Sequence, residues 1–167
     1  MKAIMSEINA TERLERFLNF YNNLSQSNLD SLVELYANNV EFIDPVHHML
    51  GLEQLQQYFS HAYARLSSCH FVATSKIANQ DQGCLSWVMT FTHEAIGNGK
   101  PISVHGCSVV HWNSEGKIAY HRDYYDLNEM VLEHIPLLGF ITKKVKQKMA
   151  NNRRPPGTTL TLRCIIS

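Results

Sequence analysis

A carboxylate in an unusual place is the first sign of chemistry in this sequence. The segment VEFIDPVHHMLG, residues 40–51, is apolar and strand-like, yet it carries Asp44 directly before Pro45 and two histidines behind it. Asp before Pro is often a turn residue whose carboxylate hydrogen-bonds the nearby backbone. Alternatively, Asp44 points into an apolar pocket, where loss of water favours the neutral form of a carboxyl and suits it to general acid–base catalysis.

A second candidate pair lies in the segment GKIAYHRDYYDL, residues 116–127. Side chains alternate between the two faces of a β-strand, so His121, Asp123 and Tyr125 share one face. An imidazole and a carboxylate two residues apart on one face can reach each other. They then form either a structural pair or an acid–base pair.

Aromatic side chains on two further strand-like segments could form the wall of a pocket. Alternation puts Trp87, Met89 and Phe91 on one face of GCLSWVMTFTHEAI, and Ser108 and Trp112 on one face of KPISVHGCSVVHWN. Such a stripe is core in most proteins, but in a hollow fold the core face also lines the pocket.

Several other kinds of site lack a sequence signature. The nine histidines form no HxH, HExxH or Cys/His cluster, so we expect no metal. We find no GxGxxG, P-loop or GxSxG element, and we therefore expect no nucleotide, no cofactor and no serine hydrolase chemistry.

The elements that would position these residues change period along the chain. Apolar residues at three- and four-residue steps predict helices over residues 11–25, 27–39 and 51–66, with Asn9 or Thr11 as the first cap and Tyr36 on the apolar stripe of the second helix. Strand-like segments then follow at 69–80, 83–96, 100–113 and 116–127, separated by Gly-, Asn- and Asp-containing turns. Helices followed by an antiparallel meander predict an α+β fold with the helices on one face of a curved sheet.

The C-terminal part is expected to lie outside this core, so we divide the chain into a domain at 1–130 and an extension at 131–167. A helical pattern begins near Leu127, is expected to break at Pro136 and Gly139, and ends in a basic run. The last segment, PPGTTLTLRCIIS, is expected to be poorly ordered or an edge addition. The basic run could be a solvated helix end, pair with an acidic surface, or contact an anionic membrane.

Charge and cysteine usage limit the partners and the compartment. The first 142 residues carry eight Lys and Arg against fifteen Asp and Glu, a net charge of −7, whereas the last 25 carry seven Lys and Arg and no acid. An acidic body argues against nucleic acid as a partner. Four cysteines without CxxC spacing predict reduced thiols in a cytoplasmic protein. No apolar run is long enough for a membrane span.

Three segments resemble the ketosteroid isomerase-like, or nuclear transport factor two-like, superfamily, which includes the SnoaL-like polyketide cyclases. They are ELYANNVEFIDPVHHMLGLEQLQQYF after NLDSL, then GNGKPISVHGCSVVHWNSEGKI, and finally HRDYYDLNEM, within roughly residues 10–130. The resemblance implies a cone of three N-terminal helices on a strongly curved mixed sheet, with a pocket between them. It also implies a homodimer formed through the outer sheet face.

The resemblance assigns roles residue by residue. Asp44 takes the position of the proton-shuttling base, Phe20 that of an oxyanion-hole tyrosine (Tyr21 is adjacent), and Ser108 that of its second acid. Phe59 falls where a supporting tyrosine stands, with Tyr58 beside it. A preorganised oxyanion donor is worth about 3–4 kcal/mol, so replacement of both donors argues against true ketosteroid isomerisation.

The same resemblance places His121 and Asp123 on the concave face with Asp44. We predict these three as the catalytic set, with a ligand-binding wall of Phe20, Tyr36, Phe59, Trp87, Met89, Phe91, Ser108, Trp112 and Tyr125. Three functions stay open: cofactor-independent isomerase, cyclase, dehydratase or epoxide hydrolase chemistry on a small apolar molecule; binding of such a ligand without catalysis; and a dimeric interaction module.

Overall fold

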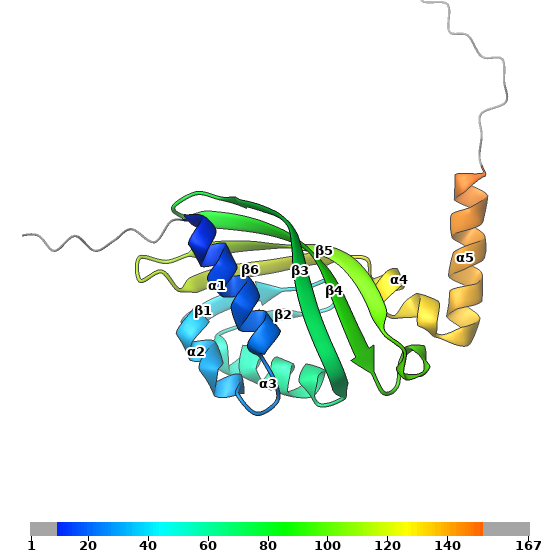
Figure 1. The fold of residues 1–167 in the computed structure, drawn as a ribbon, viewed down its shortest axis with the longest axis horizontal. Helices are drawn as coiled ribbons and strands as arrows, with labels where there is room; N and C mark the ends of the chain where they lie inside the picture. Colours follow the sequence, from blue (N-terminus) through cyan, green and yellow to red (C-terminus); the bar gives the residue numbers. More distant parts are fainter. Residues whose placement is uncertain (1–9, 152–167) are drawn as a thin grey trace, which may run out of the picture.

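Six strands form one strongly curved mixed sheet in the order β2-β1-β6-β5-β4-β3 (Figure 1). This computed structural model describes residues 10–151. The pairing of β1 with β6 is parallel and all other pairings are antiparallel. The strands are β1 (Tyr36–Ile43), β2 (His48–Leu50), β3 (Leu66–Ala78), β4 (Gln82–His93), β5 (Ile102–Trp112) and β6 (Ile118–Tyr125).

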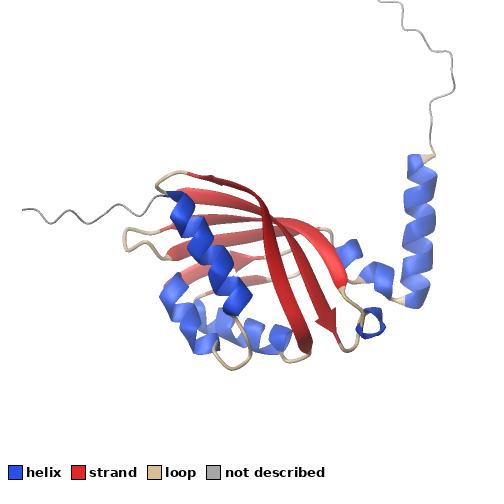
Figure 2. Cartoon of the chain, viewed as in Figure 1, coloured by secondary structure: helices blue, strands red, loops and turns tan. Residues whose placement is uncertain are grey.

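The N-terminal helices cover the concave face of this sheet (Figure 2). They are α1 (Ala10–Asn23), the short 3₁₀ turn η1 (Leu29–Ser31) continued by α2 (Leu32–Leu35), and α3 (Leu52–Tyr63). A 3₁₀ turn η2 (Gly97–Gly99) connects β4 to β5, and the chain ends in α4 (Leu127–Met130), η3 (Leu132–His134) and α5 (Pro136–Ala150). The predicted α+β cone is confirmed.

Alternation along the long strands decides which side chains enter the cone. On β4, Leu85, Trp87, Met89 and Phe91 are buried, while the residues between them face the outer side. Trp87 pairs with Gly106 across the sheet, and a Cβ at position 106 would lie 2.2 Å from the Trp87 ring. The absence of a side chain at 106 therefore makes room for the indole inside the cone.

The second predicted helix is shorter than its apolar pattern indicates. The helical turn ends at Leu35, and Tyr36 has extended backbone angles (φ −105°, ψ 147°). Tyr36 begins β1, where it pairs with Ile118 of β6. Pairing with β6 thus overrides the helical spacing and turns the Tyr36 side chain into the core, where it is fully buried.

The predicted break at Pro136 is present, because Ile135 has extended backbone angles and α5 begins at Pro136, whereas the break expected at Gly139 is absent, because α5 runs through that position. Pro136 stands at the first helical position, where its missing N–H has no helical partner to lose. Gly139 lies against the Glu133 carbonyl, 2.3 Å from where its Cβ would be, so a close approach requires glycine. The predicted Asn9 cap and the segment 155–167 lie outside the described residues.

Candidate functional site

A small cavity lies between α1 and the concave face of the sheet. Its volume is about 20 Å³, which is room for one water. Its lining comes from α1 and from all four long strands: Phe17, Leu18, Tyr21, Phe71, Leu85, Trp87, Ser108, His121 and Asp123. The wall is therefore mostly apolar and aromatic, with a few polar groups gathered on one side.

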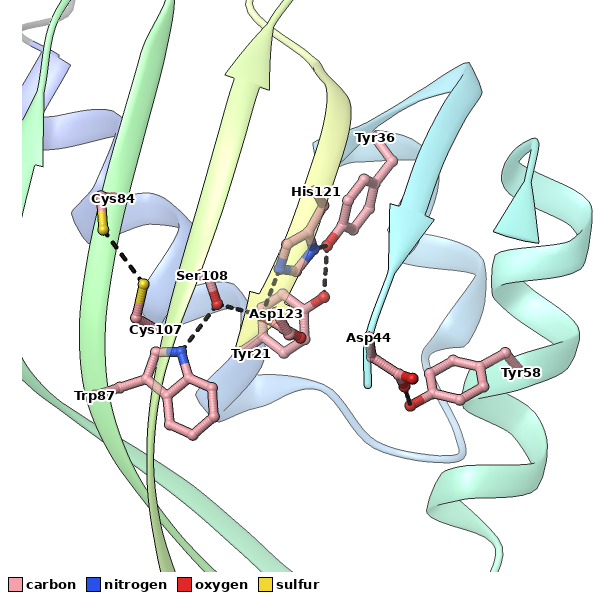
Figure 3. A network of polar contacts seen from close by, with 10 residues as sticks. All are labelled: Tyr21, Tyr36, Asp44, Tyr58, Cys84, Trp87, Cys107, Ser108, His121 and Asp123. Atoms are coloured by element: carbon pink, nitrogen blue, oxygen red, sulfur yellow. Dashed lines mark hydrogen bonds and ion pairs between the residues drawn. The ribbon is translucent and has the colours of Figure 1, made fainter. Parts of the chain in front are cut away.

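These polar groups belong to a chain of hydrogen bonds (Figure 3). The hydroxyls of Tyr21 and Tyr36 are 2.5 Å apart, and the Tyr36 hydroxyl lies 2.7 Å from Nδ1 of His121. Nε2 of His121 lies 2.9 Å from Oδ1 of Asp123. His121 is 1% exposed and is held between aromatic rings, so its orientation is tightly defined.

The chain continues from Asp123 to strands β5 and β4. Ser108 Oγ donates to Asp123 Oδ1 at 2.5 Å, and Trp87 Nε1 donates to Ser108 Oγ at 2.9 Å. Oδ1 of Asp123 thus has two partners, whereas Oδ2 has no hydrogen-bond partner within residues 10–151. The Asp123 side chain is 18% exposed and lines the cavity.

The number of hydrogens on the His121 ring decides the direction of the Tyr36 and Tyr21 hydroxyls. Burial raises the pKa of both Tyr21 and Tyr36 well above 10.0, so each phenol keeps its one hydrogen. If the imidazole is neutral with its hydrogen on Nε2, Tyr36 donates to Nδ1 and Tyr21 donates to Tyr36. If the imidazole is protonated, Nδ1–H donates to Tyr36, Tyr36 donates to Tyr21, and the Tyr21 hydrogen is released toward the cavity.

Asp44 makes a separate set of contacts at the end of β1. Oδ1 accepts the backbone N–H groups of Val46 at 2.7 Å and His47 at 2.6 Å, and Oδ2 accepts the Tyr58 hydroxyl at 2.8 Å. Nδ1 of His47 lies 3.1 Å from both oxygens. The carboxylate is 1% exposed, so Asp44 is both a turn residue and a buried group. Figure 3 shows it facing Tyr58, apart from the His121–Asp123 chain.

Tyr125, at the end of β6, connects the two carboxylates electrostatically. Burial raises the pKa of its phenol, and the negative charges of Asp44 and Asp123 raise it further. Asp44 nevertheless does not line the cavity.

The other predicted wall residues lie at varying distances from the cavity. Phe59 packs edge-on against Tyr21, with 5.8 Å between ring centroids, and Met89 and Phe91 are buried without lining the cavity. Trp112 lies under the Arg13 guanidinium, 5.3 Å from the ring centroid. Phe20 is partly buried and lines an open groove beside α1.

Five lining residues were absent from the predicted set: Phe17, Leu18, Tyr21, Phe71 and Leu85. Helical periodicity could have identified the inward-facing residues of α1. Leu14, Phe17 and Tyr21 follow three- and four-residue steps, and Phe20 does not belong to this series. The resemblance assigned the tyrosine position to Phe20, one residue before Tyr21. On a helix, one residue corresponds to a rotation of about 100°.

Residues 10–151 contain neither a membrane-spanning helix nor a group of metal-binding side chains. This part of the chain has no helix long and apolar enough to cross a membrane. Within the same residues, no three His, Cys, Asp or Glu side chains are grouped so that they could hold a metal ion.

Comparisons with known proteins agree with the fold. A protein with a ketosteroid isomerase-like fold from Catenulispora acidiphila, solved with trimethylamine, has a TM-score of 0.64 at 19% identity, covering 75% of this chain and 93% of the other. A candidate SnoaL-like polyketide cyclase from Jannaschia sp. CCS1 gives 0.60 at 15% identity, covering 71% and 88%. An LEH-like epoxide hydrolase from M. tuberculosis gives 0.59 at 15% identity, covering 79% and 91%.

No curated protein matches the sequence. The sequence family described as the SnoaL-like domain, however, matches residues 16–121, which is more than half of the chain and includes the second half of α1 and every cavity-lining residue except Asp123. The chain therefore belongs to the SnoaL-like domain family.

Proposed function

We propose that this protein catalyses proton transfer on a small apolar molecule, with Asp123 as the base and Tyr21 as the hydrogen-bond donor. The observation that carries the proposal is the hydrogen-bond chain Tyr21–Tyr36–His121–Asp123, because both of its end residues line one apolar cavity. A ketone or an enol fits such a pair, because it has an acidic C–H for Asp123 and a neighbouring oxygen for the Tyr21 hydroxyl.

The proposed step moves one proton. Oδ2 of Asp123 takes a proton from a substrate carbon, so that a C–H bond breaks and an O–H bond forms. The electron pair left behind moves onto the substrate oxygen, which accepts a hydrogen bond from Tyr21. Return of the proton from Asp123 to a different carbon completes an isomerisation. Attack by the carbanion on a second carbonyl of the same molecule forms a C–C bond and an alkoxide, and the alkoxide takes the proton back from Asp123 to complete a cyclisation.

His121 acts in this proposal as a positioning residue. In its protonated form it holds Oδ1 of Asp123 through Nε2 and, through Nδ1, turns the Tyr36 hydroxyl toward Tyr21, so that the Tyr21 hydrogen faces the cavity. Asp44, predicted as the base, has partners on both oxygens. It is therefore the second candidate for that role.

Substrate entry requires the cavity wall to move, because about 20 Å³ holds only one water. Leu18 and Phe71 are the partly exposed members of the apolar wall, and Phe71 lies on the edge strand β3. We propose that a ligand enters by displacing these two side chains. The trimethylamine complex of the Catenulispora protein supports the idea that a fold of this kind accommodates a small organic molecule.

Hydrogen–deuterium exchange tests the chemistry without knowledge of the natural substrate. The full chain is incubated in D₂O with a panel of small apolar ketones and enones, and mass spectrometry measures deuterium incorporation at carbon. We expect Asp123→Asn to lose about 10²–10⁴-fold of the exchange rate and Tyr21→Phe about 10²–10³-fold. Asp30→Asn, an exposed site on η1, is the matched control and should retain the wild-type rate.

The small cavity also favours a second function, that of a dimeric interaction module with a filled cone. The outer sheet face carries exposed apolar side chains, including Val72, Ile77 and Tyr124. We propose that this face forms a homodimer, with or without catalysis. A dimer by light scattering that becomes monomeric with Val72→Asp, together with no exchange on any compound in the panel, would favour this function over the enzyme.

A further inference from the structure

Helix α5 stands away from the cone (Figure 1). Its main contact with the rest of the described chain is with η3, directly before it. Gly139 is the only residue of α5 that is buried. Most of this 15-residue helix is therefore not covered by any other part of residues 10–151. The residues on its two sides indicate what it could bind.

The side of α5 that faces the body is small and polar. Gly139 lies against the Glu133 carbonyl, and Lys146 Nζ lies 2.7 Å from Glu133 Oε1 and 3.6 Å from Asp126 Oδ2. The hydrogen bond from Lys146 lowers the pKa of Glu133, which keeps this carboxylate charged. These contacts fix the rotation of the helix about its axis.

The opposite side of α5 is apolar and points away from the body. At 3.6 residues per turn, five residues fall on one face; we call them the apolar stripe. They are Leu137, Leu138, Ile141, Val145 and Met149. Their exposed fractions lie between 41% and 73%. A helix that packs against its own domain normally buries such a stripe and exposes its charges, so the orientation of α5 is reversed.

Lysines border the apolar stripe. Lys144 and Lys148 are four residues apart and fall on either side of Leu137 at one edge of the stripe, and Lys143 and Lys146 lie on the other sides of the helix. Residues 136–151 contain these four lysines and no acidic residue. An apolar face edged by lysine is the pattern of helices that lie in the plane of a membrane interface, where the apolar face enters the acyl region and the ammonium groups contact anionic headgroups.

From this orientation and charge we propose that α5 binds the surface of an anionic membrane, with the apolar stripe inserted and Lys144 and Lys148 on the lipid headgroups. The rest of the protein stays outside the bilayer. This inference concerns α5 alone and does not depend on the proposed function of the cone.

Flotation with unilamellar vesicles tests this binding with the full chain. We expect binding to vesicles of phosphatidylcholine with phosphatidylglycerol, weaker binding at high salt, and little binding to phosphatidylcholine alone. Absence of binding to both kinds of vesicle would overturn the proposal. A result in which both vesicles bind equally well at any salt concentration would overturn the role of the lysines.

A matched pair of variants separates insertion from charge. Val145→Asp places a new negative charge in the apolar stripe, and Gln147→Asp places the same charge on nearly the opposite side of the helix. The added negative charge should weaken vesicle binding about fivefold in both variants. Val145→Asp also removes an inserted valine, so it should bind at least about tenfold more weakly than Gln147→Asp. Equal weakening contradicts insertion. If Val145→Asp instead dissociates an oligomer in light scattering while the wild type binds no vesicle, the stripe is a contact between copies and the proposal fails.

Discussion

Two carboxylates near the ends of neighbouring strands, one buried and one partly buried, are used in different ways. Asp44, after β1, has hydrogen-bond partners on both oxygens, two of them backbone N–H groups of its own turn. Asp123, on β6, has two partners on Oδ1 and none on Oδ2 among the described residues. A saturated carboxylate stabilises local structure, whereas a carboxylate held by one oxygen is oriented and still able to react. Burial of an acid therefore does not by itself identify a catalytic base.

The largest expected effect is on turnover, and it should distinguish the two carboxylates. For any compound that the wild type exchanges with solvent deuterium, Asp123→Asn should lose about 10²–10⁴-fold in rate, while Asp44→Asn keeps a rate within about tenfold of wild type. The measurement is deuterium incorporation under saturating compound, with circular dichroism as the check on folding. The reverse ranking would give the base role to Asp44.

The second effect is on stability, where we expect Asp44→Asn to be the more damaging of the two carboxylate substitutions. Asp44→Asn replaces an acceptor of several hydrogen bonds by an amide that offers only one accepting oxygen, and we expect it to cost about 1–3 kcal/mol of the free energy of unfolding. Urea denaturation measures this cost. Tyr58→Phe, which removes only one hydrogen bond from the same carboxylate, should cost about 1 kcal/mol. A cost for Asp44→Asn smaller than that for Tyr58→Phe would mean that the turn contacts contribute nothing.

Alkaline pH probes the phenols beside both carboxylates. Burial raises the pKa of Tyr21, and burial followed by the charge and hydrogen bond of Asp44 raises that of Tyr58. Because each folded pKa lies above the unfolded value of 10.0, the stabilisation is complete below that pH and is lost as the pH rises above it. Each such tyrosine should cost about 1.4 kcal/mol per pH unit above about 10.

Denaturation at a series of alkaline pH values tests this slope. Tyr21→Phe should reduce the slope because it removes one buried phenol from the count. A slope identical to that of wild type would mean that Tyr21 ionises as easily in the folded protein as in the unfolded chain.

The smallest effect concerns a carboxylate–imidazole pair at the surface. Glu41 Oε1 lies 2.9 Å from His48 Nε2, the same separation as in the less exposed His121–Asp123 pair, but the Glu41 and His48 side chains are 40% and 56% exposed. Solvent screens such a pair, so Glu41→Gln should change stability by about 0.5 kcal/mol or less. A larger loss in urea denaturation would show that distance matters more than burial in this protein.

Much of the architecture could be predicted because it depends on local patterns. The four long strands have a period of two over many residues, and this alternation groups Trp87 with Met89 and Phe91, and His121 with Asp123, without knowledge of the fold. The second helix was predicted too long because its spacing continues into Tyr36, whose pairing with β6 comes from a segment 82 residues away. Local spacing contains no information about such a partner.

The candidate site was predictable only in part, and for the same reason. Parity places His121 and Asp123 together, and the structure brings both to the cavity with Trp87 and Ser108. The partner of His121 on its other nitrogen, Tyr36, and the next tyrosine, Tyr21, come from β1 and α1. Whether Phe20 or Tyr21 points inward depends on the rotation of α1 over the sheet.

The sequence by itself determined the α+β order of elements, the alternation of the strands, the SnoaL-like resemblance and the separation of an acidic body from a basic end. Only the tertiary structure decided which oxygen of which carboxylate is left without a partner, and which side of α5 faces outward. The physical reason is that hydrogen-bond saturation and helix rotation are set by contacts between segments distant in the chain, whereas composition and periodicity record only what each segment prefers on its own.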